Sequence, residues 1–207
     1  MCTRYRFTVD GTDGKMAAFI GAMERKFPGQ YQIGDIGPGT VAPAMAERAG
    51  KIVAVAAAFG VPAPRGGKLL LNARAETAAR KPLFADGLRC RRILLPATGF
   101  YEWGGDARKI RHFFAREDGR TFFLCGIRFG TGGLFRFVIL TRPASEPVAA
   151  VHDRMPVIVG ADGVRAYLTD FAAAESLVAT ASPKLEKTIC PGRAGDGQEG
   201  GPLLPFG

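Results

Sequence analysis

Residues 93–103 read ILLPATGFYEW, and we interpret this largely apolar stretch as extended chain in a strand-rich fold. Alternate side chains of an extended segment face opposite sides, so Phe100, Glu102 and Gly104 share one face. A carboxylate on an aromatic, partly buried face is expected to have a raised pKa, which suits general acid–base chemistry. The alternative is an exposed Glu102 on an edge strand, with Tyr101 and Trp103 as the buried pair.

Short apolar or alternating segments surround this stretch on both sides. They predict further strands at residues 2–9, 41–45, 51–59, 110–114, 121–129 and 134–140. Helices are predicted at residues 15–27, 161–168 and 170–179, with another that begins at Ala75 and is stopped by Pro82. Loops are predicted at residues 34–40, 60–67 and 141–147, and hairpin turns at residues 117–120 and 130–133.

Many short strands and few helices predict an α+β fold with a mostly antiparallel, curved sheet. No internal repeat or linker is visible, so we expect one domain over residues 1–190. A tail rich in glycine and proline follows over residues 191–207 and is expected to be irregular. We expect a monomer.

The composition limits the classes of function. The net charge of +9 comes from 28 basic and 19 acidic residues, which favours a polyanionic partner such as nucleic acid. No apolar run approaches the ~20 residues of a membrane span, and no secretory signal is visible, so a cytoplasmic protein without a membrane partner is expected. The four cysteines lack the paired spacing of a metal or redox site, so we expect free thiols, no metal and no cofactor.

Cys2 follows the initiator methionine directly. If an aminopeptidase removes Met1, Cys2 carries a thiol and a free amine on adjacent carbons. The thiol titrates near ~8.5 and the amine near ~8, so a fraction of each is nucleophilic at neutral pH. Such a 1,2-aminothiol condenses with an aldehyde, first as an imine and then as a thiazolidine ring. A cysteine at this position by chance is the alternative.

Further polar candidates lie at the ends of predicted strands. Asn72 and Arg74 follow the apolar run at residues 68–71, although Asn72 also fits a turn or helix cap. His152 lies at a loop-to-strand junction and is the better candidate for proton transfer. His112 alternates with apolar residues in a strand, so we interpret it as structural.

Together these pieces resemble the SOS response-associated peptidase (SRAP) family. The resemblance depends on motifs that occur in the family's order: Met1-Cys2 followed by Arg4, the hexapeptide Asn72–Thr77, the glutamate motif Pro96–Trp103 and the histidine motif His152–Pro156. A looser match at residues 36–39 falls where the family has a proline loop. The matched region runs from residue 2 to about residue 185, and the fold it implies has a compact, barrel-like β core.

The resemblance implies a sensor of abasic sites in single-stranded DNA. In this interpretation Cys2 traps the open-chain aldehyde of the sugar as a thiazolidine DNA–protein crosslink. Asn72 positions the N-terminal residue and the sugar, Glu102 shuttles protons, and His152 handles protons at the opened sugar and in crosslink reversal. Arg4 and Arg74 contact phosphates, and Thr141 and Pro38 are weaker matches to DNA-contacting residues. The resemblance also implies a cysteine peptidase that acts on its own N-terminus, and strand cleavage at abasic sites by β-elimination.

Two departures from the family pattern stand out. The family's tryptophan-containing stretch before the hexapeptide is replaced here by residues 59–64, which contain no tryptophan. Those aromatics stack on or wedge between bases, so Phe59 is expected to substitute in part and DNA binding to be weaker. In addition, Thr3 stands where the family commonly has glycine.

Two other functions remain open at this point. The same residues fit an N-terminal-nucleophile hydrolase of a peptide or amide. A noncatalytic nucleic-acid-binding module is favoured if Met1 is retained, because Cys2 then has no free amine.

Overall fold

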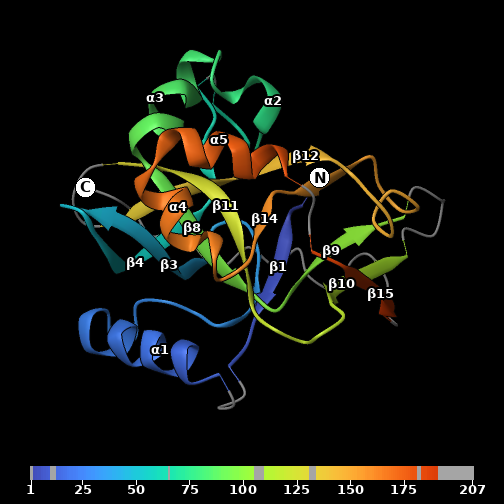
Figure 1. Cartoon of the computed structure of the whole chain (residues 1–207), viewed down its shortest axis with the longest axis horizontal. Helices are drawn as coiled ribbons and strands as arrows, with labels where there is room; N and C mark the ends of the chain where they lie inside the picture. The colour runs from blue at the N-terminus through green and yellow to red at the C-terminus, as the bar shows by residue number, and fades with distance from the viewer. Residues whose placement is uncertain are drawn as a thin grey trace.

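The computed structural model describes residues 2–9, 13–64, 66–104, 110–130, 134–180 and 183–190. The predicted tail over residues 191–207 lies outside this part of the chain. Along the described residues, runs of consecutive strands are separated by a few short helices (Figure 1).

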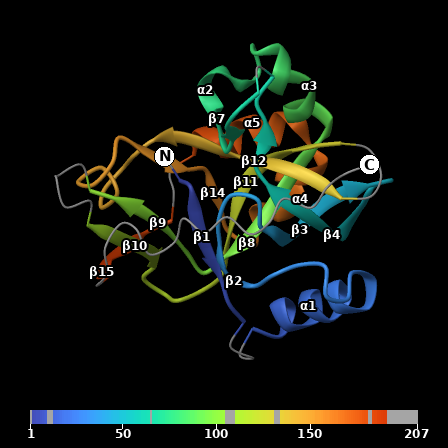
Figure 2. The same cartoon turned by 180° about the vertical axis from the view of Figure 1, so that it is seen from behind.

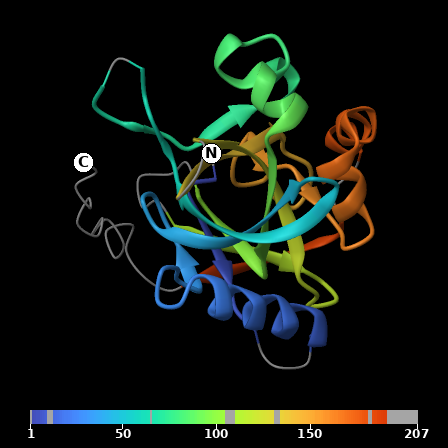
Figure 3. The same ribbon diagram turned by 90° about the vertical axis from the view of Figure 1, so that its left-hand side faces the viewer.

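Five strands close into a barrel because the last pairs with the first. The order is β12–β4–β3–β8–β11 and back to β12, and all of these pairings are antiparallel except the parallel pair β12–β4. The strands are β3 (Val41–Arg48), β4 (Lys51–Phe59), β8 (Arg92–Ala97), β11 (Phe122–Phe129) and β12 (Phe135–Pro143). Figure 3 shows them curving around the core.

Gly126 shows how closely the barrel strands approach one another. A Cβ on this residue would lie 2.7 Å from the Val138 carbonyl oxygen and 3.1 Å from the Ile93 side chain. Glycine is therefore required where β11 crosses between β8 and β12.

Three short strands extend the barrel sheet. They are β7 (Asn72–Arg74) and β13 (Arg154–Pro156), which both pair with β12, and β14 (Ile158–Val159), which pairs with β11. A second sheet has the order β15–β10–β9–β1–β2, and β5 (Val61–Pro62) pairs with β6 (Leu69–Leu70). The strands of the second sheet are β1 (Arg4–Phe7), β2 (Gly34–Ile36), β9 (Gly99–Trp103), β10 (Arg111–Arg116) and β15 (Leu185–Cys190).

The helices are short and cover the outside of the sheets. They are α1 (Gly14–Lys26), α2 (Ala75–Ala78), α3 (Pro82–Cys90), α4 (Gly163–Thr169) and α5 (Phe171–Ala179). The Asp13 side chain caps α1 by accepting hydrogen bonds from the backbone N–H groups of Lys15 and Met16. Figures 1 and 2 show α1 apart from the other four helices. In the described part of the chain, the helices are all too short or too polar to span a membrane.

The predicted α+β class with a curved, mostly antiparallel sheet is confirmed. The predicted strand at residues 51–59 matches β4, and the helix at residues 15–27 matches α1 within one residue at each end. The predicted helix that begins at Ala75 and ends before Pro82 matches α2. The following helix, α3, was not predicted, and Pro82 occupies its first turn, where the missing N–H costs no hydrogen bond.

Other errors concern strands whose partners are distant in the sequence. Residues 34–36, predicted as loop, form β2 by pairing with β1, and β15 was not predicted. Residues 61–62 form β5, and β12 continues to Pro143. The turn after Arg116 is not a hairpin, because β10 and β11 belong to different sheets.

Candidate functional site

Cys2 and Glu102 are two buried polar groups near the start of the chain. Cys2 precedes β1 and is fully buried, and its Sγ lies 3.8 Å from the Arg4 carbonyl oxygen. Burial raises the pKa of the Cys2 thiol well above its usual range, and the Glu102 carboxylate raises it further. The two groups are therefore within electrostatic reach of each other. In Figures 1, 2 and 3 the beginning of β1 lies near β12.

Glu102 lies on β9 between β1 and β10, not on an edge strand. Its side chain is 2% exposed, and burial raises the pKa of the carboxyl group to about 7. The alternative of an exposed glutamate is therefore excluded. Tyr101 on the opposite face is also buried. The guanidinium groups of Arg6 and Arg111 cover its ring, at 5.6 and 5.3 Å from the ring centre.

His152 lies just before β13, and its side chain is 27% exposed. Its Nδ1 is 3.0 Å from the Arg154 backbone nitrogen and 2.8 Å from Asp153 Oδ1. The N–H of Arg154 can donate to the neutral ring, whereas the protonated ring can donate to Asp153, so each protonation state has a partner. Burial lowers the pKa of His152 and favours the neutral form. The Asp153 carboxylate also raises the pKa of the Glu102 carboxyl group. This loop therefore lies within electrostatic reach of β9.

The hexapeptide and the histidine motif meet at the end of β12. Thr141 on β12 is in register with Arg74 of β7 on one side and with Pro156 of β13 on the other. The buried Arg154 joins the two motifs: its Nη2 lies 2.8 Å from Glu76 Oε2 and 2.7 Å from the Thr141 carbonyl oxygen. Neither Arg154 nor Glu76 was predicted to have a role. Only their membership of the two motifs could have suggested such a role.

Asn72 and Arg74 differ in their exposure to solvent. Asn72 begins β7, and its Oδ1 is buried without a hydrogen-bond partner among the described residues. Arg74 at the end of the same strand is exposed. The hexapeptide thus presents one amide oxygen inside the protein and one cation to solvent.

The half-buried Arg4 and the proline loop, in which Pro38 and Gly39 are exposed, lie together beside β1. A Cβ on Gly37 would lie 3.2 Å from Nη2 of Arg4, so the guanidinium group lies against this loop. Pro38 is exposed at the turn that Thr40 closes by donating its N–H to the Gly37 carbonyl oxygen at 3.1 Å.

Two of the residues predicted to contact DNA are buried in the structure. Phe59 is fully buried, stacks on Phe137 with ring centres 5.0 Å apart, and meets the Tyr5 ring edge-on at 6.1 Å. It is a core residue and cannot replace a base-stacking tryptophan in this conformation. Thr141 is also fully buried, with its Oγ1 3.4 Å from Arg154 Nη2, so it supports the motifs from within.

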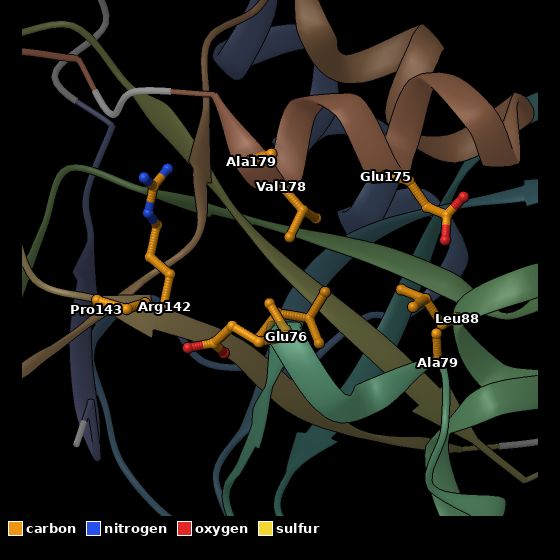
Figure 4. Close-up of a pocket in the computed structure, with 10 residues that line it drawn as sticks. Glu76, Ala79, Leu88, Arg142, Pro143, Glu175, Val178 and Ala179 are labelled. Carbon is orange, nitrogen blue, oxygen red and sulfur yellow. The ribbon is translucent and has the colours of Figure 1, made fainter.

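A separate cavity of about 390 Å³ lies between α2, α5 and β12 (Figure 4). Its lining is mainly apolar but includes the charged groups of Glu76, Arg142 and Glu175. Cys2, Asn72, Glu102 and His152 are not among the residues that line it. Within the described ranges, no group of three or more His, Cys, Asp or Glu side chains could hold a metal ion.

The arrangement combines a buried thiol, a carboxyl group with a pKa near neutrality, an imidazole with a partner in each protonation state, and a buried amide oxygen. These groups suit nucleophilic chemistry that needs proton transfer in both directions. The exposed guanidinium groups suit an anionic substrate.

The chain is similar in sequence to curated proteins of known name. The chain is 34% identical over 109 residues to the abasic site processing protein YobE of Bacillus subtilis, which is 49% of this chain and 50% of that protein. It is 32% identical over 104 residues to the abasic site processing protein YedK of Escherichia coli, 48% of this chain and 47% of that protein. The matched regions thus span about half the length of these curated relatives.

Two solved structures share the fold. A phage-related protein from Bordetella bronchiseptica superposes with a TM-score of 0.72 at 21% identity, over 92% of this chain and 95% of that chain. A protein from Bacteroides thetaiotaomicron superposes with a TM-score of 0.70 at 22% identity, over 91% of both chains. The family model described as SOS response associated peptidase matches residues 1–189. The chain therefore belongs to the SOS response associated peptidase (SRAP) family.

Proposed function

We propose that this protein recognises abasic sites in single-stranded DNA and crosslinks to them through Cys2 after removal of Met1. The observation that carries the proposal is the buried Glu102 carboxyl, with a pKa of about 7, within electrostatic reach of the buried Cys2 thiol. The relatives that are named abasic site processing proteins support the choice of substrate.

The proposed chemistry balances without a cofactor. The Cys2 amine adds to the sugar aldehyde to give a carbinolamine, which loses one water to form an imine. The thiol then adds across the C=N bond, and its proton passes to the nitrogen, which closes the thiazolidine. With a pKa of about 7, Glu102 can protonate the leaving hydroxyl group, take up the proton that the nitrogen releases as the imine forms, and relay the thiol proton to the nitrogen at ring closure. His152 receives and returns protons at the opened sugar, and the Asn72 amide positions the Cys2 amine.

Recognition of DNA is assigned to cations near the site. Arg74 and Arg4 bind backbone phosphates, and Pro38 lies beside Arg4 at the same rim. Phosphate contacts position the strand without reading its sequence, which suits a protein that responds to a lesion.

Peptidase action on the chain's own N-terminus is the second candidate function. The family description supports it, as does the position of the Cys2 thiol directly after the Met1–Cys2 bond. An aminopeptidase that removes Met1 would make this activity unnecessary.

The test is the intact mass of the protein before and after incubation with a single-stranded oligonucleotide that contains one abasic site. We expect loss of Met1 and a denaturation-resistant adduct with the mass of protein plus DNA minus one water. Cys2→Ala should abolish the adduct, whereas Cys90→Ala, which changes an exposed cysteine, should not.

Other outcomes would decide against the proposal. A protein without Met1 that forms no adduct would favour an amide hydrolase. A protein that keeps Met1 and binds DNA only reversibly would favour a noncatalytic binding module. An adduct that survives in Cys2→Ala would assign the crosslink to another residue.

A further inference from the structure

The Tyr5 hydroxyl is a buried polar group without a hydrogen-bond partner in the described structure. Tyr5 lies in the middle of β1 and is 1% exposed. A buried hydroxyl without a partner destabilises the folded state, so it is rare in stable proteins. Phenylalanine would fill the same space without that cost.

The other tyrosines of the chain, all in the described part, have partners. Tyr31 lies 2.8 Å from Glu24, Tyr101 lies 3.0 Å from Asp35, and Tyr167 donates to the Gly126 carbonyl oxygen at 3.0 Å. Tyr167 is as deeply buried as Tyr5. Burial alone therefore does not leave a tyrosine without a partner in this fold.

The position of Tyr5 connects it with the candidate site. It pairs across the sheet with Phe100, and Glu102 lies two residues further along β9 on the same face. The edge-on contact with Phe59 fixes its ring from the barrel side. Burial raises the pKa of the Tyr5 hydroxyl well above its usual range, and the Cys2 thiolate adds to this effect. The hydroxyl therefore stays protonated and lies within electrostatic reach of Cys2.

We propose that the Tyr5 hydroxyl is a further substrate-binding group of the Cys2 site, which donates a hydrogen bond to the aldehyde oxygen of the substrate. This inference rests on the proposed function. As the Cys2 amine adds to the aldehyde carbon, the C=O π bond breaks and negative charge develops on that oxygen. The Tyr5 hydroxyl stabilises this charge and keeps its own proton. The oxygen takes one proton from the attacking amine and a second from Glu102, and then leaves as water. A donor placed where charge develops lowers the barrier to addition.

The test compares Tyr5→Phe with Tyr167→Phe as the matched buried tyrosine. We expect Tyr5→Phe to fold with a Tm at or above that of the unmodified protein, because no hydrogen bond is lost. Its maximal crosslinking rate with abasic single-stranded DNA should fall by about 10- to 100-fold. The DNA concentration for half-maximal rate should not change. Tyr167→Phe should lower Tm and leave the crosslinking rate unchanged.

The possible failures are distinguishable. A Tyr5→Phe protein that crosslinks at the unmodified rate would overturn the role of Tyr5 and leave the crosslinking function intact. A lower Tm for Tyr5→Phe would show that the hydroxyl has a structural partner, which also overturns the inference. No adduct with the unmodified protein would overturn both proposals.

Discussion

At the residue scale, Glu102 affects stability as well as chemistry. Burial raises the pKa of this carboxyl group from an ordinary 4.5 to about 7 in the folded protein. Between these two pH values the folded state holds the proton more tightly than the unfolded chain does. Stability therefore falls as the pH rises from 4.5 to 7, and the cost of the charged carboxylate is fully present above pH 7.

We predict that the free energy of unfolding at pH 8 is higher for Glu102→Gln than for the unmodified protein. The expected difference in unfolding free energy is at most about 3 kcal/mol, because the pKa of Glu102 rises from 4.5 to about 7 on folding. The difference should disappear near pH 4.5, because the unmodified carboxyl is then protonated. Urea unfolding at a series of pH values measures this, with Glu117→Gln, an exposed carboxylate in the turn after β10, as the control. A Glu102→Gln protein that is less stable at pH 8 would contradict the burial argument.

At the scale of elements, the Glu76–Arg154 ion pair joins α2 to the start of β13. The hydrogen bond from Arg154 lowers the pKa of Glu76 to about 2. The stabilisation is therefore present above pH 4.5 and is lost as the pH falls from 4.5 to about 2. Because the pair also fixes Arg154, whose backbone N–H contacts His152, it holds the histidine motif in place.

A double-mutant cycle with Glu76→Gln and Arg154→Met should give a coupling energy of about 1 kcal/mol at pH 7. The value is modest because the Glu76 side chain is 44% exposed and water screens the pair. The Arg91–Asp86 pair at the end of α3, whose side chains are 35% and 61% exposed, is the control and should show a smaller coupling energy. Equal coupling at pH 7 and pH 2 would contradict the ion-pair assignment.

Elements with a strong local signal could be predicted from the sequence, and the others could not. The apolar run of β4 and the one-sided periodicity of α1 define both elements without reference to the rest of the chain. In contrast, β2 is three residues long and exists because β1 pairs with it. The exposed residues of β15 form a strand because β10 provides its hydrogen-bond partners.

At the scale of the whole molecule, the motifs suggested candidate site residues but not their arrangement. Cys2, Glu102 and His152 are distant in sequence, and β9 and the end of β12 bring them within electrostatic reach. The burial of Phe59 and Thr141 could not be predicted, because it depends on Phe137 and Arg154, which no local pattern reveals. The missing partner of the Tyr5 hydroxyl is likewise invisible in the sequence.

The net charge of +9 also acts at this scale, because it favours any polyanionic partner, whereas phosphate binding is proposed here for particular arginines. We expect Arg74→Gln to weaken binding of single-stranded DNA and to reduce the slope of log K against log salt by about 0.7. Fluorescence anisotropy over a range of salt concentrations measures the slope.

Lys51→Gln is the matched control for this prediction. This substitution removes one exposed cation. Lys51 begins β4 and Phe59 ends it, so the two residues lie about 26 Å apart along the strand. The slope should stay unchanged in this variant. Equal slopes for the two variants would show that Arg74 makes no particular contact with phosphate.

The burial of Cys2 also determines which cysteine suffers chemical damage. Oxidants and alkylating reagents attack exposed thiolates, and the Cys2 thiol is neither exposed nor easily ionised. Cys90 is exposed on α3 and is therefore more accessible to such reagents than Cys2, although its hydrogen bond with Asp86 raises the pKa of its thiol. The fold therefore keeps its proposed nucleophile chemically intact under oxidative stress, when damaged DNA is most abundant, and leaves a cysteine outside the proposed site to be modified instead.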